Sequence, residues 1–102
     1  MINFTKNDDL NKIINDNDIA IIQYGSATCM PCHSIKNRIT MWQENHKDIV
    51  AYYISLEENM EIAAQRGILS APTVEVYIEG FRIIDINQVK QLLGREPVDI
   101  LA

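Results

Sequence analysis

The stretch IAIIQYGSATCMPCH, residues 19–33, decides how this chain of 102 residues is expected to fold. Its first six residues are apolar apart from Gln23, and such a run is typical of a strand that is buried on both faces of a sheet. Residues 25–28 form a short loop, and Cys29 and Cys32 follow it where a helix is expected to begin. Pro31 suits the first helical turn, because the N–H that proline lacks would have no helical partner there.

The segments around this stretch are expected to alternate between helices and strands. Asn7 is a good N-cap for a first helix, and Gly67 fits the position just after the end of a later one. Strands are predicted over residues 2–4, 19–24, 49–56, 73–78 and 81–86, and helices from about residue 7 and over residues 32–45, 58–66 and 87–93. We therefore expect a single α/β domain over residues 1–102, with a mixed central sheet flanked by helices on both faces.

The charge of the chain argues against two classes of partner. The net charge is −5, and the nine Lys and Arg residues are scattered along the sequence. Nucleic acids and anionic membrane surfaces are bound by clustered Lys and Arg, so we expect neither as a partner. No apolar stretch approaches the roughly 20 residues of a membrane-spanning helix. The N-terminal residues lack the basic and apolar segments of a signal peptide, so we expect a cytoplasmic protein.

The spacing of Cys29 and Cys32 favours chemistry over a structural role. A disulfide stabilises mainly by closing a loop of the unfolded chain, and this loop is very short. A structural disulfide would also not persist in a reducing cytoplasm. A Cys-x-x-Cys pair is therefore interpreted as metal binding or redox chemistry. At a helix N-terminus, free N–H groups and the helix dipole would stabilise a thiolate at Cys29 and lower its pKa from about 8.5.

A second motif, Ser70-Ala71-Pro72-Thr73, comes just before a predicted strand. The sequence resembles the thioredoxin family in this motif, in the Cys-x-Pro-Cys that follows a buried strand, and in the order of the predicted elements. The resemblance covers essentially the whole chain. The resemblance implies that Pro72 is cis and lies beside the cysteine pair. It also implies that Ala71 offers backbone groups to an extended substrate.

The resemblance further implies a thiol–disulfide oxidoreductase that reduces disulfides in other proteins and needs no bound cofactor or metal. Cys29 would be the nucleophile and Cys32 the resolving thiol, and a reductase or dithiol donor would recycle the pair. An apolar docking surface would comprise Thr28, Met30, Pro31, Ala71 and Pro72.

Three positions depart from the usual pattern of the family. Thr28 stands where a Trp usually precedes the first cysteine, Gln23 replaces a buried Asp, and Asn37 replaces a helix-kinking Pro. The segment 82–87 is also shorter than the usual connection and lacks its Gly. These departures indicate a divergent thioredoxin-like protein. Gln23 is predicted to be a hydrogen-bonded buried amide, since an amide cannot accept a proton near pH 7.

Other functions are compatible with parts of the sequence. Zinc binding would need His33 and His46, but His33 adjoins Cys32 and His46 is expected about three turns further along the same helix. Cys29-Met30-Pro31-Cys32-His33 also matches the attachment motif of c-type haem. A binding or chaperone-like module with little turnover is the main alternative, because a fold does not by itself determine a function. His33 is interpreted as a surface residue in the first turn of the helix. The alternative, functional interpretation is a local cation that helps to lower the pKa of Cys29.

Overall fold

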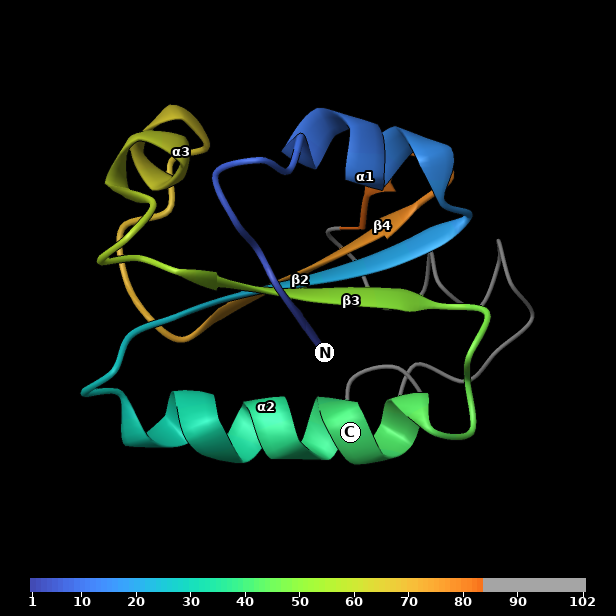
Figure 1. Cartoon of the computed structure of the whole chain (residues 1–102), viewed down its shortest axis with the longest axis horizontal. Coiled ribbons are helices and arrows are strands. Elements are labelled where there is room, and N and C mark those ends of the chain that lie inside the picture. The colour runs from blue at the N-terminus through green and yellow to red at the C-terminus, as the bar shows by residue number, and fades with distance from the viewer. Residues whose placement is uncertain (84–102) are drawn as a thin grey trace.

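The computed structural model describes residues 1–83, which form five strands and three helices. Figure 1 shows how they are arranged. In chain order the elements are β1 (Ile2–Asn3), α1 (Leu10–Asp16), β2 (Ile19–Gly25), α2 (Met30–Gln43), β3 (Val50–Ser55), α3 (Met60–Gln65), β4 (Thr73–Ile78) and β5 (Phe81–Arg82).

The strands form one mixed sheet in the order β1-β3-β2-β4-β5. β1, β3 and β2 run parallel, whereas β4 is antiparallel to β2 and β5 is antiparallel to β4. The central strand β2 places Gln23 opposite Tyr53 of β3 and Val74 of β4. The expected mixed sheet is therefore confirmed.

The helices lie on both sides of this sheet, with α2 below it and α1 and α3 above it in Figure 1. Alternate residues of β2 enter two apolar clusters. Ile19 and Ile21 pack with Ile39 of α2, and Ile22 packs with Leu10 and other residues of the α1 side. Every residue of β2 is buried, which confirms the prediction of a strand covered on both faces.

Two helices begin at other residues than expected. Asp9, and not Asn7, caps α1 by accepting a hydrogen bond from the Lys12 N–H at 3.2 Å. Asp8 is engaged in the preceding turn, where it accepts the Thr5 N–H at 2.8 Å, so the helix cannot start earlier. The predicted helix over residues 32–45 begins earlier, at Met30, because Cys29 itself is its N-cap, and it ends at Gln43.

The remaining strands and helix agree with the sequence to within two residues at each end where the structure describes them. β3 and α3 are slightly shorter than predicted, and β4 coincides with residues 73–78. β5 ends at Arg82, and the rest of its predicted strand from residue 84 on, like the helix over residues 87–93, lies outside the described residues. In the part of the chain that is described, no helix is both long and apolar enough to cross a membrane.

Candidate active site

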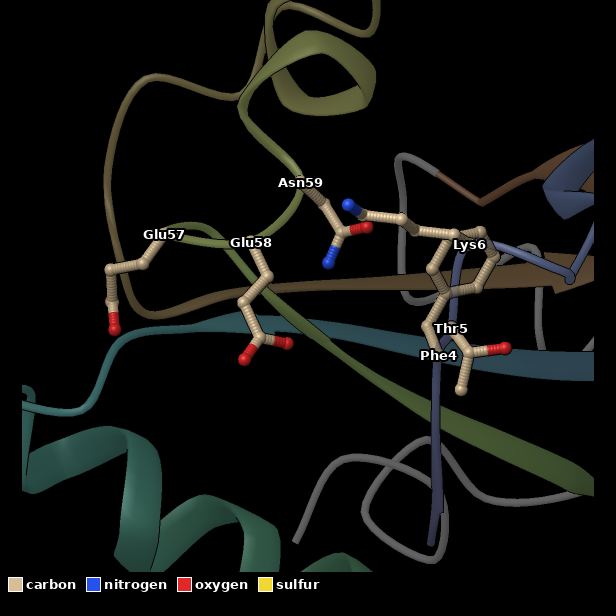
Figure 2. A pocket seen from close by; sticks show the side chains of 6 residues that line it. All are labelled: Phe4, Thr5, Lys6, Glu57, Glu58 and Asn59. Carbon is tan, nitrogen blue, oxygen red and sulfur yellow. The ribbon is translucent and has the colours of Figure 1, made fainter.

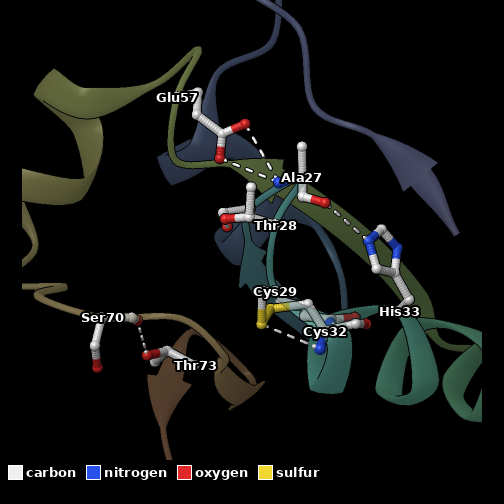
Figure 3. The surroundings of a disulfide bond; sticks show 10 residues. Ala27, Thr28, Cys29, Cys32, His33, Glu57, Ser70 and Thr73 are labelled. Carbon is white, nitrogen blue, oxygen red and sulfur yellow. Dashed lines mark hydrogen bonds between the residues drawn. A yellow bond between two sulfur atoms is a disulfide. The ribbon is translucent and has the colours of Figure 1, made fainter.

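Cys29 and Cys32 meet at the N-terminus of α2, where they form a disulfide bond (Figure 3). Their Cα atoms are 5.3 Å apart, and the Cys29 Sγ also accepts a hydrogen bond from the Cys32 N–H at 3.2 Å. Cys29 thus occupies the N-cap position, and Pro31 lies in the first turn, where it displaces no hydrogen bond. The two sulfurs are thus held close enough to form and break a disulfide at the start of the helix.

The two sulfurs differ in their access to solvent. Cys29 is partly exposed, whereas Cys32 is fully buried at 0% exposure. A partner can therefore reach Cys29 and not Cys32. When the pair is reduced, a thiolate at Cys29 would also lie at the positive end of α2, next to the N–H groups of its first turn.

Gln23 lies beneath the pair, on the face of β2 that α2 covers. Its side chain is 0% exposed, and its Nε2 donates to the Cys32 carbonyl oxygen at 2.8 Å. This confirms the prediction of a hydrogen-bonded buried amide. Among the described residues, its Oε1 has no hydrogen-bond partner. Position 23 thus touches the backbone of the buried cysteine with a neutral group.

The Ala71-Pro72 segment reaches the same end of the sheet from β4. Thr73 pairs with Tyr24 at the end of β2, so the chain entering β4 lies at the edge where the cysteine loop begins. The Ala71–Pro72 peptide bond is cis in this structure. The Thr73 hydroxyl donates to the Ser70 carbonyl oxygen at 2.7 Å, and this hydrogen bond closes the turn that contains Ala71 and Pro72 (Figure 3).

The residues expected to form a docking surface lie around Cys29 at the surface. Thr28, Met30 and Pro31 are exposed, with Met30 at 76%, and Pro72 is exposed beside the partly buried Ala71. Sequence reasoning missed two further exposed apolar residues that flank Pro72, Leu69 at 95% and Val74 at 36%. A Leu in the loop between Gly67 and Pro72 was the available signal for the first of them.

The two histidines do not join the cysteines. The His33 Nε2 lies 3.3 Å from the Ala27 carbonyl oxygen, and the ring is turned away from the sulfurs in Figure 3. His46 follows the end of α2 and stacks on Trp42 with ring centroids 3.9 Å apart. Within residues 1–83 there is no group of three or more His, Cys, Asp or Glu side chains that could hold a metal ion.

Comparison with known proteins agrees with this geometry. The sequence profile of the thioredoxin family matches residues 1–94. A thioredoxin of Alicyclobacillus acidocaldarius is 29% identical over 79% of this chain and 72% of its own length. The NADPH-dependent thioredoxin reductase 3 of Arabidopsis thaliana is 31% identical over 71% of this chain, which corresponds to 14% of that longer protein.

Solved structures share the fold. The solution structure of the oxidised thioredoxin from Plasmodium falciparum superimposes with a TM-score of 0.74 at 21% identity, over 100% of this chain and 99% of the other. The family match, the sheet order and the cysteine pair lead to one conclusion. The chain belongs to the thioredoxin family and is a thiol–disulfide oxidoreductase.

Proposed function

We propose that this protein reduces disulfides of other proteins, with Cys29 as the attacking thiol and Cys32 as the resolving thiol. The difference in access supports these roles, because Cys29 is partly exposed and Cys32 is fully buried. The Cys29 thiolate attacks one sulfur of the substrate disulfide, forms a mixed disulfide and expels the other sulfur as a thiolate. Cys32 then loses its proton and attacks the Cys29 Sγ, which releases the second substrate thiolate and closes the Cys29–Cys32 disulfide.

The substrate would dock on the apolar surface around Cys29. Met30 and Pro31 offer exposed apolar groups on the α2 side, and Pro72 does so on the β4 side. Thr28 precedes the attacking cysteine, and Ala71 would pair its backbone with an extended segment of the substrate. Leu69 and Val74 extend the same apolar surface past Pro72.

Each turnover leaves the pair oxidised, so a second protein must return two electrons. We propose a reductase or dithiol donor, because thioredoxin-family proteins are recycled in this way and one relative is named an NADPH-dependent thioredoxin reductase. The chain itself would then carry electrons between two partners and need no cofactor. The cytoplasmic location, and the absence of nucleic-acid and membrane partners, stay predictions from the sequence.

A turnover assay tests this proposal. The full chain is mixed with a disulfide-containing protein and dithiothreitol, and the loss of the substrate disulfide is followed over time. We expect the wild type to accelerate reduction well above dithiothreitol alone and Cys29→Ser to abolish the acceleration. A wild type that binds the substrate without accelerating its reduction would favour a binding or chaperone-like module instead.

A further inference from the structure

Two side chains hold the loop that leads into Cys29, one from each side. The Ala27 N–H donates to both carboxylate oxygens of Glu57, at 3.2 and 3.3 Å. The Ala27 carbonyl oxygen lies 3.3 Å from the His33 Nε2. Figure 3 shows Glu57 and His33 on opposite sides of Ala27, with Cys29 following the loop they hold.

The rest of the loop is tied to the same two elements. The Leu56 N–H donates to the Gly25 carbonyl oxygen at 2.9 Å, and the Cys29 N–H donates to the Ser26 carbonyl oxygen at 3.2 Å. The loop is therefore attached to the chain after β3 through Leu56 and Glu57, and to the first turn of α2 through His33. No sulfur atom takes part in these contacts.

We propose that Glu57 and His33 are positioning residues, which keep Cys29 at the N-cap of α2 when the disulfide is open. In the oxidised protein the covalent bond to Cys32 holds the Cys29 Sγ near the Cys32 N–H. Reduction removes that bond, and the contacts to Ala27 then restrain the loop. This inference rests on the proposed role of Cys29, since only an attacking thiolate needs to be held at the helix terminus.

The charge of Glu57 makes the proposal testable. A carboxylate near Cys29 disfavours a thiolate by Coulomb repulsion, so loss of the charge alone would lower the pKa of Cys29. Loss of the loop position would have the opposite effect, because the thiolate would move away from the helix terminus that stabilises it. The titratable side chains bound to the loop are Glu57 and His33, and Tyr53 of β3 lies against Gly25 at its start. The segment 70–73 across from the disulfide carries no titratable side chain.

Glu58 provides a matched control for Glu57. Both carboxylates follow β3 and line the pocket in Figure 2, but Glu57 reaches toward the loop before α2 whereas Glu58 points into the open space of the pocket. Both residues are exposed. Replacing either with Ala removes one negative charge from adjacent positions of the chain, and Glu57→Ala alone removes the contact with Ala27.

The experiment measures alkylation of Cys29 by iodoacetamide in the reduced full chain across a range of pH. For Glu57→Ala we expect a rate at pH 7 about three- to tenfold below wild type, the size of losing a helix cap, and a higher midpoint of the pH profile. His33→Ala should also lower the alkylation rate and raise the midpoint of the pH profile. The changes should be smaller, because His33 makes one contact with Ala27 whereas Glu57 makes two. Glu57→Gln, which keeps an acceptor oxygen, should alkylate at least as fast as the wild type.

The control sets the result that overturns the inference. Glu58→Ala should leave the rate at or slightly above wild type. If Glu57→Ala matches Glu58→Ala, the contact with Ala27 does not position Cys29 and the inference is wrong, whatever the melting temperatures show. Because Cys32 is fully buried, alkylation reports on Cys29. This failure is therefore distinct from failure of the proposed function, in which the wild type itself would show no turnover.

Discussion

Two buried polar side chains on neighbouring strands have opposite surroundings. Gln23 of β2 lies on the α2 face, donates one hydrogen bond to the Cys32 carbonyl and leaves its Oε1 without a partner among the described residues. Glu75 of β4 lies on the other face, where the Tyr77 hydroxyl donates to its Oε1 at 3.0 Å and Arg82 contacts its Oε2 at 3.3 Å. The group beside the cysteines is neutral and incompletely paired, whereas the carboxylate away from them is paired at both oxygens.

The surroundings of Glu75 are those of a structural network. Burial raises the pKa of the Tyr24 and Tyr77 hydroxyls, and the negative charge of Glu75 raises both further. Both tyrosines therefore stay protonated at neutral pH, and Tyr77 can donate to Glu75. Arg66 in turn donates to the Tyr77 hydroxyl at 3.3 Å. The two tyrosines and the arginine thus surround Glu75 with partners on the α1 and α3 face, whereas Gln23 contacts the backbone of Cys32 on the α2 face.

Among the substitutions that test this difference between Gln23 and Glu75, Glu75→Ala should have the largest effect on stability. The substitution removes the acceptor of the Tyr77 hydroxyl and the partner of Arg82, and it leaves a space in a buried site. We expect a loss of about 2–3 kcal/mol in the free energy of unfolding, less than for a fully buried ion pair. Arg82 is 54% exposed and can be solvated when its partner is gone.

Urea unfolding checks this value, with Glu58→Ala as the exposed control that should change stability by less than about 0.5 kcal/mol. Disulfide reduction by folded Glu75→Ala protein should stay at the wild-type rate, because the cysteines lie on the other face of the sheet. A loss no larger than that of the control would show that the paired carboxylate does not stabilise the fold.

A smaller effect on stability is expected for Gln23→Asp. Burial should raise the pKa of the introduced carboxyl above the value of about 3.9 that it has in the unfolded chain. The resulting penalty is absent below about pH 4, grows as the pH rises toward the folded-state pKa and is constant above it. We expect a loss of about 1–2 kcal/mol in the free energy of unfolding at pH 7, which corresponds to a rise of about one unit or slightly more in the pKa of the introduced carboxyl.

The same substitution should accelerate the reaction of Cys32. Position 23 already contacts the Cys32 backbone, so a carboxylate there can accept the Cys32 proton during resolution. Stopped-flow measurements of mixed-disulfide resolution test this, with Gln23→Asn as an uncharged control of the same length. Equal rates for Gln23→Asp and Gln23→Asn would mean that a base at this position does not assist Cys32.

The smallest effect should be the response of Trp42 fluorescence to reduction. Trp42 lies on α2 ten residues beyond Cys32, or about 15 Å at the helical rise of about 1.5 Å per residue. Its ring also stacks on His46, which lies beyond the end of α2. Emission spectra before and after dithiothreitol should nearly coincide. A large increase on reduction would require a closer approach of Trp42 to the cysteines than this helix allows.

The sequence predicted the parts of the molecule that depend on local pattern. The apolar run of β2 and the strand after Pro72 were placed correctly, because burial on both faces and the proline each leave a strong local signal. The start of α1 was wrong because Asn7, Asp8 and Asp9 are all good caps. A contact between Thr5 and Asp8 decides among them.

Contacts between distant segments could not be predicted in the same way. The hydrogen bond between Ala27 and Glu57 spans thirty residues, and the partner of Gln23 is a backbone carbonyl that no side-chain pattern indicates. The pairing of Glu75 with Arg82 depends on the turn between β4 and β5. The cysteine pair was predictable from spacing, but the loop contacts that hold it follow only from the folded chain.

Trapping of mixed disulfides tests the roles of the two cysteines most directly. Cys32→Ser and Cys29→Ser proteins are each incubated with oxidised substrate protein, quenched with acid and run on non-reducing gels. We expect Cys32→Ser to accumulate reductant-sensitive adducts, because Cys29 is partly exposed and attack still occurs while release is blocked. Cys29→Ser should accumulate few adducts, because Cys32 is fully buried. Equal trapping by both variants would contradict the assignment of Cys29 as the attacking thiol.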